Sequence, residues 1–586
     1  MSLPFEPQEG PVSLHALRHS VSHIMAEAVT RLIPEARVAI GPPIEHGFYY
    51  DFELPRPLSE EDLPRIEEEM RRILREAGEF QRIQTSREEA RRRLEEAGQP
   101  YKLALLEDIP PDEPITFYDH GTWGDLCEGP HVESASQIPA DGFKLLSVAG
   151  AYWRGDASQP MLQRIYGTAW WSRKDLKKYL AWLEEVQARD HRRLGRELDL
   201  FSLHPEFGAG LVFWHPRLAH LRRRLEEWWW QLHEEAGYWP VYTPHVAGEE
   251  VFERSGHLQN YAEMIWAPMD VDGRPHRVKP MNCPGHVTIF NSRRHSYRDL
   301  PLRFAELGTV YRYEPSGTLH GMLRVRGFTQ DDAHIFCTPQ QLEDEIVGVL
   351  DLVDRILRTF GYEYSAYLAT RPEKSLGSDE VWDHAMAALK AAASRRGLEL
   401  HDDPGGGVFY GPKIDFKMKD AIGREWQGPT VQVDFNLPER FDLKYNDADN
   451  ELKRPVMVHR AIFGSFERFA GGLIEHFAGW FPVWLHPHPV AVLPISADQE
   501  EAAREWVRAI EEGGFRCVLK TDGPLRRRIR EAEVEKIPYM AVLGGREVEQ
   551  GVVNLRVHGV QEQRSLDRAA FLELLREKRD SKALEY

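Results

Sequence analysis

Residues 304–337, FAELGTVYRYEPSGTLHGMLRVRGFTQDDAHIFC, decide the fold of the central part of this chain. Apolar, aromatic and β-branched residues lie on both sides of PSGTLHG (315–321), whose glycine, serine and proline are typical of a turn. We therefore predict two antiparallel strands joined by that turn. The sequence contains no Walker loop and no GxGxxG after a strand, so a nucleotide would have to bind on an antiparallel sheet.

The returning strand carries several chemically useful side chains. Residues two apart in a strand share a face, so Gln330, Asp332 and His334 should lie together. Cys337 should point away from His334, which makes it the weaker candidate for a metal ligand.

The strand pattern continues further along the chain. Residues 408–436 predict more strands, broken by Gly411-Pro412 and by Gly428-Pro429. After Pro455 a short apolar strand should be followed by a helix that runs to about Trp484.

Helices and a second α/β pattern flank this region. The sequence predicts a long helix from about Pro216 to Ala236, ended by Gly237, and a helical connection over Ser172–Arg196. An acidic and basic stretch at 59–97 indicates an exposed pair of helices. Beyond residues 485–490, strands and helices alternate, as in a small α/β domain of about 100 residues.

Composition limits the possible classes of protein. With 586 residues the chain is too long for a single core, and its net charge of −19 argues against nonspecific coating of nucleic acid. Four scattered cysteines exclude a disulfide scaffold. No apolar stretch approaches a membrane span and no secretory signal opens the chain, so we expect a cytoplasmic protein without membrane contact.

Three distant residues could form a metal site. Cys283, in a loop of KPMNCPGH, would join His334 and His459 as a Cys-His-His set, and catalytic zinc usually keeps three protein ligands and one open position. Their spacing alone is weak evidence, because a single buried histidine is more often a hydrogen-bonded core residue. Both interpretations stay open on the residues alone.

Arginines in the same segments suit a triphosphate, since a planar guanidinium forms paired hydrogen bonds and stays charged. Arg312 is predicted on a strand with Glu314 on its face, and Arg324 at the start of the returning strand. Gly464 and Arg468 are predicted on one helix face, where the glycine leaves room for a flat ring. The alternative is that these arginines form ordinary surface ion pairs.

The order of three segments points to a known family. GYWPVYTPHV (237–246), residues 304–337 and VHRAIFGSFERF (458–469) resemble motifs 1, 2 and 3 of class II aminoacyl-tRNA synthetases. The motifs MNCPGH, QDDAHIF and HRAIFGSFERF are similar to those of the threonyl-tRNA synthetase family, and the resemblance covers nearly the whole chain. It implies a homodimeric ligase that joins threonine to tRNA(Thr), with one Zn²⁺ per subunit and Mg²⁺ accompanying ATP.

The resemblance also assigns roles. The zinc ligands would be Cys283, His334 and His459. ATP would be contacted by Arg312, Glu314, Arg324, Gln427 and Arg468, with Arg312 and Arg468 as the catalytic arginines. The threonine pocket would consist of Gln330, Asp332, Tyr410, Lys413, Gln432 and Ser465. Pro244 in motif 1 would lie at a dimer interface.

A second site is expected because serine differs from threonine by only one methyl group. HSVSH (19–23) and CEGPH (127–131) supply two histidines on one helix face and a Cys-His pair. By themselves these residues look like a structural or hydrolytic zinc site, although the glutamate of HExxH is missing. They resemble the editing domain shared by threonyl- and alanyl-tRNA synthetases, which implies hydrolysis of seryl-tRNA(Thr) without an obligatory metal. The implied editing residues are His19, His23, Lys102, Asp125, Cys127 and His131.

The implied fold class combines α/β and α+β domains. We expect an N-terminal α+β editing domain (1–171), a linker helix (172–198), a class II catalytic domain on an antiparallel sheet (199–487) and a C-terminal α/β anticodon-binding domain (488–586). In the last of these, Glu547 and Arg556 match positions expected to read anticodon bases. Many family members begin with a ubiquitin-like domain, for which there is no room before His19; it is either naturally missing or removed from this chain.

Three rival interpretations make different demands on the sequence. A prolyl or seryl synthetase would share the arginines but has no comparable use for the Cys-His-His set. A regulatory RNA-binding paralogue with a dead active site predicts loss of an ATP arginine or a ligand, and all are present. A metallohydrolase centred on His19 would leave the other two thirds of the chain without a role.

Overall fold

The computed structural model describes residues 3–76, 78–156 and 158–586. The chain forms two compact units, Leu3–Glu185 and Val186–Tyr586. The boundary lies within the helical stretch predicted at 172–196. This stretch consists of α5 (Arg173–Arg189) and α6 (His191–Glu197), separated at Asp190, whose carboxylate accepts a hydrogen bond from the Arg192 amide and so begins the second helix.

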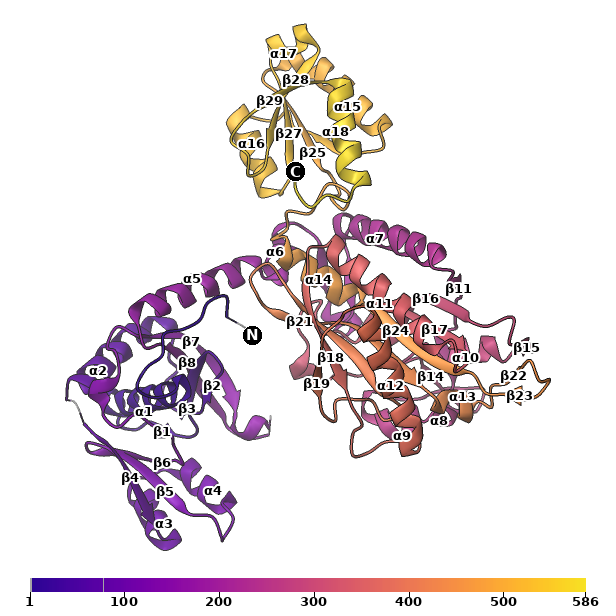
Figure 1. The fold of residues 1–586 in the computed structure, drawn as a ribbon. Coiled ribbons are helices and arrows are strands. Elements are labelled where there is room, and N and C mark those ends of the chain that lie inside the picture. The colour runs from indigo at the N-terminus through magenta and orange to yellow at the C-terminus, as the bar shows by residue number, and fades with distance from the viewer. Residues whose placement is uncertain (1–2, 77, 157) are drawn as a thin grey trace. The chain divides into compact units, whose positions relative to one another are not determined.

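The N-terminal unit contains two sheets (Figure 1). The larger has the strand order β1-β3-β8-β7, with β2 beside β3, and α1 and α2 pack against it; the smaller has the order β4-β5-β6 and carries α3 and α4. The strands are β1 (Arg37–Val38), β2 (Pro43–Ile44), β3 (Gly47–Glu53), β4 (Phe80–Thr85), β5 (Ile115–His120), β6 (Trp123–Leu126), β7 (Phe143–Tyr152) and β8 (Met161–Ala169). The helices are α1 (Leu14–Leu32), α2 (Leu63–Glu76), α3 (Arg87–Glu96) and α4 (Pro100–Asp108).

The prediction of an exposed helix pair at 59–97 is wrong in part. A strand, β4, separates the two helices, and α2 buries a full apolar stripe that includes Ile66, Met70 and Ile73. Most of its charged residues occupy the opposite face, and the buried Glu67 accepts a hydrogen bond from the Leu145 amide, so the helix is amphipathic rather than exposed all round.

The second unit is built on an eight-stranded, mainly antiparallel sheet with the order β11-β16-β17-β24-β21-β20-β18-β19. The predicted central pair is confirmed as β16 (Leu302–Tyr311) and β17 (Gly327–Cys337), paired antiparallel. The other strands are β11 (Trp239–Pro240), β18 (Glu363–Ala369), β19 (Leu400–Asp403), β20 (Lys413–Lys419), β21 (Glu425–Asp434) and β24 (Val456–Ser465).

The two faces of β17 have different surroundings, as its alternation predicts. Ala333, Ile335 and Cys337 join the main apolar core with α7 (Pro216–Glu235) and α11 (Leu342–Thr359), and α12 (Asp379–Arg395) lies beside α11 (Figure 1). The other face is therefore left for the polar residues at 330, 332 and 334.

Several local predictions need correction. Arg312 and Arg324 lie in the loop between β16 and β17, not on the strands, because the pairing stops at Tyr311 and Gly327. Gly428-Pro429 lies within β21, where an irregularity in the pairing with β20 accommodates it.

Gly464 is on β24 with φ +73°, so it does not share a helix face with Arg468; α14 (Phe466–His476) begins after it and ends well before Trp484. Cys283 is not a loop residue but the first residue of α10 (Cys283–Phe290).

The C-terminal part is the predicted small α/β fold, with the strand order β26-β25-β27-β28-β29. Its elements are β25 (Val490–Pro494), α15 (Glu500–Glu512), β26 (Cys517–Leu519), α16 (Leu525–Val534), β27 (Tyr539–Leu543), α17 (Gly545–Gln550), β28 (Val552–Val557), β29 (Arg564–Asp567) and α18 (Arg568–Asp580). Among the described residues, none of the helices has the length and apolar character needed to cross a bilayer.

Candidate active site

An open cavity of about 560 Å³ lies on the polar face of the central sheet. The β16–β17 loop, β17, β21 and the junction of β24 with α14 form its walls. All five residues predicted to contact ATP line it, together with two of the predicted pocket residues: Arg312, Glu314, Arg324, Gln427, Arg468, Gln330 and Ser465. Residues far apart in sequence are thus brought together as predicted.

The cavity is strongly cationic. Arg324 donates twice to Glu314 Oε2, at 3.0 and 2.9 Å, and Arg312 Nε donates to the Pro280 carbonyl at 3.2 Å. Arg468 Nε is buried without a hydrogen-bond partner among the described residues. Burial, and then the charge of Arg324, lower the pKa of Arg468. An anion in this cavity would relieve the repulsion between the two guanidinium groups.

Next to this cavity, a thiol and two imidazoles face one another. Cys283 Sγ and one nitrogen from each of His334 and His459 all lie within 4.8 Å of one another, and all three side chains are buried. His334 Nε2 is 2.9 Å from His459 Nδ1. Cys337 lies in the core on the other face of β17, as predicted.

The surroundings of this cluster suit a metal ion. His459 Nε2 lies 2.8 Å from Asp434 Oδ2, so it donates to that carboxylate and leaves Nδ1 with a lone pair. Burial is the main reason that the pKa of Cys283 is raised and that of His334 lowered. Without a bound cation, the two facing nitrogens would have only one proton or none between them. The donor set and its partners therefore fit tetrahedral zinc with an open position.

The predicted amino-acid pocket adjoins the cluster. Asn282 Nδ2 donates to Asp332 Oδ2 at 3.2 Å, and Asp332 Oδ1 is 3.7 Å from His334 Nε2. The Tyr410 hydroxyl donates to Gln432 Oε1 at 2.8 Å, and its ring lies 5.4 Å from that of His459.

Two other predicted pocket residues are already engaged. Lys413 Nζ pairs with Asp415 at 2.6 Å. The Ser465 hydroxyl accepts from the Arg468 amide at 3.1 Å, so it serves as the N-cap of α14 as well as lining the cavity.

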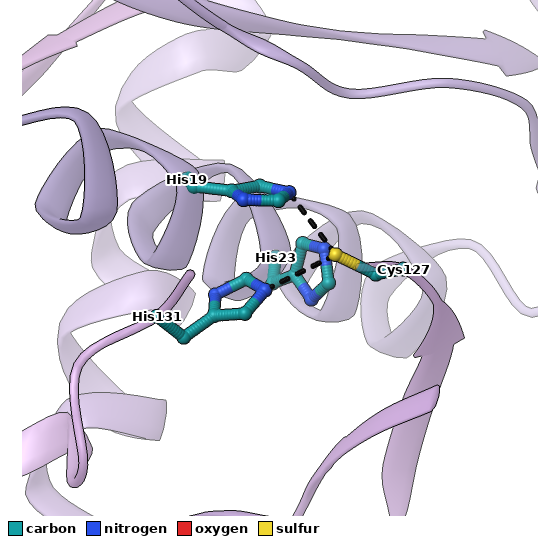
Figure 2. A group of neighbouring side chains, drawn as sticks. All are labelled: His19, His23, Cys127 and His131. Atoms are coloured by element: carbon teal, nitrogen blue, oxygen red, sulfur yellow. Dashed lines mark hydrogen bonds between the residues drawn. The ribbon is translucent and has the colours of Figure 1, made fainter. Parts of the chain in front are cut away.

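A second cluster lies in the N-terminal unit (Figure 2). Cys127 Sγ is 3.2 Å from His19 Nε2 and 3.3 Å from His131 Nε2, and it accepts from the Gly129 amide at 3.2 Å. His19 and His23 lie one turn apart on α1, as predicted. Burial raises the pKa of the Cys127 thiol to about 12 and lowers that of His19 to about 4. Near neutral pH these two groups are uncharged.

The four side chains could also hold a divalent ion, because one donor atom from each lies within 4.8 Å of the others. Lys102 and Asp125 lie at the side of the cluster. Lys102 Nζ is 2.7 Å from Asp125 Oδ1, and His23 Nε2 is 3.7 Å from Asp125 Oδ2. All six predicted residues of this site are therefore brought together.

Comparisons with known proteins agree with this geometry. Three family models match: "tRNA synthetase class II core domain (G, H, P, S and T)" over residues 269–477, "Anticodon binding domain" over 489–578, and "Threonyl and Alanyl tRNA synthetase second additional domain" over 115–166. The threonine–tRNA ligase of Magnetococcus marinus is 49% identical over 579 residues, which is 98% of this chain and 89% of that protein. The chain belongs to the threonine–tRNA ligase family.

Other relatives of the threonine–tRNA ligase family support this. The chloroplastic/mitochondrial threonine–tRNA ligase 2 of Arabidopsis thaliana is 52% identical, over 94% of this chain and 84% of its own. A crystal structure titled as the RNA binding domain of threonyl-tRNA synthetase from Cryptosporidium parvum has a TM-score of 0.64 and 37% identity, covering 66% of this chain and 98% of that one. A prolyl-tRNA synthetase from the same organism, 15% identical with a TM-score of 0.52, shares the fold. The predicted fold class, a class II core with editing and anticodon-binding domains, is confirmed.

Several neighbours of the two sites of this ligase were not predicted from the sequence. Phe328 and Trp426 line the cationic cavity, Asn282 contacts Asp332, and the Tyr50 hydroxyl donates to Asp125. Asn282 is adjacent to Cys283, and Phe328 lies two residues before Gln330. Both could therefore have been predicted from the sequence. Tyr50 is on β3, far from HSVSH and CEGPH in sequence, and gave no signal.

The two predicted anticodon residues have separate surroundings. Glu547 accepts from the Gly544 amide at 3.0 Å and so caps the short helix α17. Arg556 is on β28 and lines a cavity with Met540 and His558, to which Glu547 does not contribute.

Proposed function

We propose that this ligase activates threonine with ATP, transfers it to tRNA(Thr), and hydrolyses seryl-tRNA(Thr) at the N-terminal cluster. One observation carries the first part of the proposal. Along a single face of β17, Gln330 lines the cationic cavity, Asp332 follows, and His334 belongs to the thiol–imidazole cluster. Residues two apart on a strand are about 7 Å apart. A nucleotide and a small substrate on the cluster would thus be neighbours.

Cys283, His334 and His459 would hold Zn²⁺, one per subunit. When bound, the metal would act as a Lewis acid that holds the amino and hydroxyl groups of threonine. Asp332, which accepts a hydrogen bond from Asn282, would accept a second hydrogen bond from the threonine hydroxyl. Valine lacks that hydroxyl and would leave these buried polar groups without a partner, a mismatch that can be rejected by as much as ~10⁴–10⁵.

The arginines would act on the triphosphate. Attack of the threonine carboxylate on the α-phosphate depends on positioning and charge neutralisation. Arg312 and Arg468 would neutralise the charge that develops on the phosphate, with Mg²⁺ accompanying ATP. Arg324 and Glu314, which are hydrogen-bonded to each other in the β16–β17 loop, would also contact ATP. Gln427 would contact the nucleotide from β21. Tyr410, Lys413, Gln432 and Ser465 remain proposed members of the threonine pocket.

Serine keeps the hydroxyl, and loss of one methyl group is worth only about 1–3 kcal/mol, or roughly 10–200-fold. A hydrolytic site is therefore needed. At the N-terminal cluster, the uncharged His19 and Cys127 are already hydrogen-bonded, and no glutamate follows the first histidine to act as the base of a metal site. We propose that His19, His23, Cys127 and His131 position a water molecule, with Lys102 and Asp125 at their side, without an obligatory metal.

The remaining proposals concern partners and organisation. We propose that the domains comprise residues 1–171, 172–198, 199–487 and 488–586. We also propose that the protein acts in the cytoplasm, where ribosomes consume charged tRNA. Glu547 and Arg556 would read anticodon bases. A homodimer is favoured because Trp239 (67% exposed) and Tyr242 (78%) lie beside the exposed Pro244.

The test is ATP–pyrophosphate exchange with threonine, serine, valine and proline, on zinc-loaded and on chelated enzyme. We expect exchange with threonine, weaker exchange with serine, and loss of both on chelation. Exchange with proline but not threonine would overturn the substrate assignment. For editing, a Cys127→Ala variant should clear seryl-tRNA(Thr) slowly; clearance at the normal rate would sink that assignment.

A further inference from the structure

A buried chain of side chains continues behind His334, and the proposed reaction gives it no role. His334 Nδ1 lies 2.8 Å from Nδ1 of His286, on α10, and His286 Nε2 lies 3.1 Å from Glu306 Oε2, on β16. His286 and Glu306 are 0% and 3% exposed. Neither contacts the cationic cavity.

Glu306 is held firmly at the end of this chain. Its carboxylate accepts from the Thr243 amide at 2.9 Å and from the Thr243 hydroxyl, and Lys279 Nζ is 3.3 Å away. Burial acts to raise the pKa of Glu306, but the hydrogen bonds from His286 and from the Thr243 amide, and the charge of Lys279, outweigh it and lower the pKa to about 2. Glu306 is therefore a carboxylate, which can only accept hydrogen bonds.

The direction of each hydrogen bond follows from this. His286 Nε2 has to donate to Glu306, so in a neutral His286 the Nδ1 atom is an acceptor. His334 Nδ1 then has to donate to it, and His334 Nε2 carries the lone pair. That atom is the one that faces His459 Nδ1 at 2.9 Å.

His459 is also held with its lone pair facing the cluster, but a carboxylate contacts its ring directly. His459 Nε2 donates directly to Asp434, whose second oxygen accepts from the Asn436 and Leu437 amides. The Nδ1 atom of His334 reaches a carboxylate only through His286, because His286 of α10 lies next to that atom. Both histidines thus present an unprotonated nitrogen to the same point.

We propose that His286 and Glu306 are positioning residues for the metal centre: they hold His334 in the orientation and tautomer that bind Zn²⁺. This inference rests on the proposed zinc site. Partners of this kind typically change metal affinity by 10–100-fold. His286 itself is not a ligand, because both of its nitrogens are already engaged.

Two amide substitutions separate positioning from packing. In His286→Asn the amide oxygen occupies the place of Nδ1 and can accept from His334. In His286→Gln the amide group reaches instead to the place of Nε2, which leaves His334 without its acceptor. The matched control is His295→Gln, since His295 is equally buried, stacks on Phe290 and donates to its carbonyl, away from the cluster.

Zinc affinity of the full chain is measured by competition with a chelator, and the visible absorption bands of the Co²⁺-substituted protein report ligand geometry. We expect His286→Gln to weaken zinc binding by 10-fold or more, to shift the Co²⁺ bands and to raise KM for threonine. His286→Asn should stay within a few-fold of wild type, and His295→Gln should match it.

Two results would overturn the inference, and they differ in whether the proposed zinc site is refuted as well. Equal zinc affinity in wild type, His286→Gln and His286→Asn would leave the zinc site intact and refute the positioning role alone. Absence of zinc binding in wild type would refute the proposed metal centre and this inference with it.

Discussion

The Lys102–Asp125 pair in the N-terminal unit allows a sharp test of how the editing site is held together. Lys102 Nζ lies 2.7 and 2.8 Å from the two carboxylate oxygens of Asp125, and each side chain is only 4% exposed. The Tyr50 hydroxyl also donates to Asp125. Lys102→Met would leave a buried carboxylate with one donor in place of three hydrogen-bonded contacts.

Removing one partner of a buried ion pair typically costs 3–5 kcal/mol. Because Tyr50 still donates to Asp125, we expect the lower end, about 3 kcal/mol, or roughly 100-fold in the opening equilibrium. The double variant Lys102→Met, Asp125→Asn removes both charges, so most of that loss should be recovered.

The measurement is amide hydrogen exchange of the full chain, read on α4 and β6, which carry Lys102 and Asp125. Exchange reports local opening, which suits a chain of several domains better than a single unfolding transition. A single variant that costs less than 1 kcal/mol, or a double variant as unstable as the single one, would refute this account. Both variants should lose seryl-tRNA(Thr) hydrolysis. The double variant recovers stability, but like the single variant it lacks the Lys102 ammonium group beside the cluster.

Three further predictions follow from the same contacts. Arg468→Ala should lower the rate of ATP–pyrophosphate exchange by about 10²–10³-fold, the usual effect of removing a group that stabilises developing charge, with zinc content unchanged; a loss under threefold would contradict its proposed role. Asp331 is fully buried and accepts from the Trp229 indole and two backbone amides of β24, so Asp331→Ala leaves three donors unsatisfied. At about 1 kcal/mol or more each, the opening free energy of β24 by hydrogen exchange should fall by about 3–5 kcal/mol, and a change below 1 kcal/mol would speak against it. The pKa of His19 is lowered by burial from 6.5 to about 4, so the unfolded chain takes up its proton first as the pH falls. The urea midpoint of the N-terminal unit should therefore decline from pH 6.5 towards pH 4, and less steeply in His19→Gln; equal slopes in the two proteins would rule this out.

Local sequence patterns were enough to predict which side chains share a face at the main site. Period-two alternation separates Gln330, Asp332 and His334 from Cys337, because a strand must place successive side chains on opposite faces. HSVSH predicted a shared helix face for the same kind of reason. These are local rules, and they hold wherever the element itself is correctly recognised.

Local predictions failed where the pairing with a neighbouring strand determines the position at which a strand ends or is interrupted. Arg312 and Arg324 belong to a loop because the ladder between β16 and β17 ends at Tyr311 and Gly327, and nothing in the local pattern marks that end. Gly428-Pro429 stays inside β21 because the pairing with β20 is irregular there, with two residues of β21 opposite one of β20.

The distant groups that complete each site depend on how the helices and strands pack against one another. Glu306 is on β16, His286 on α10 and Tyr50 on β3, and each reaches its site by packing between elements and not through sequence spacing. Hydrogen-bond partners of buried polar groups are chosen by three-dimensional proximity, since burial removes water as an alternative partner. The residues that we propose for the chemistry were therefore visible in the sequence, whereas their buried hydrogen-bond partners were not.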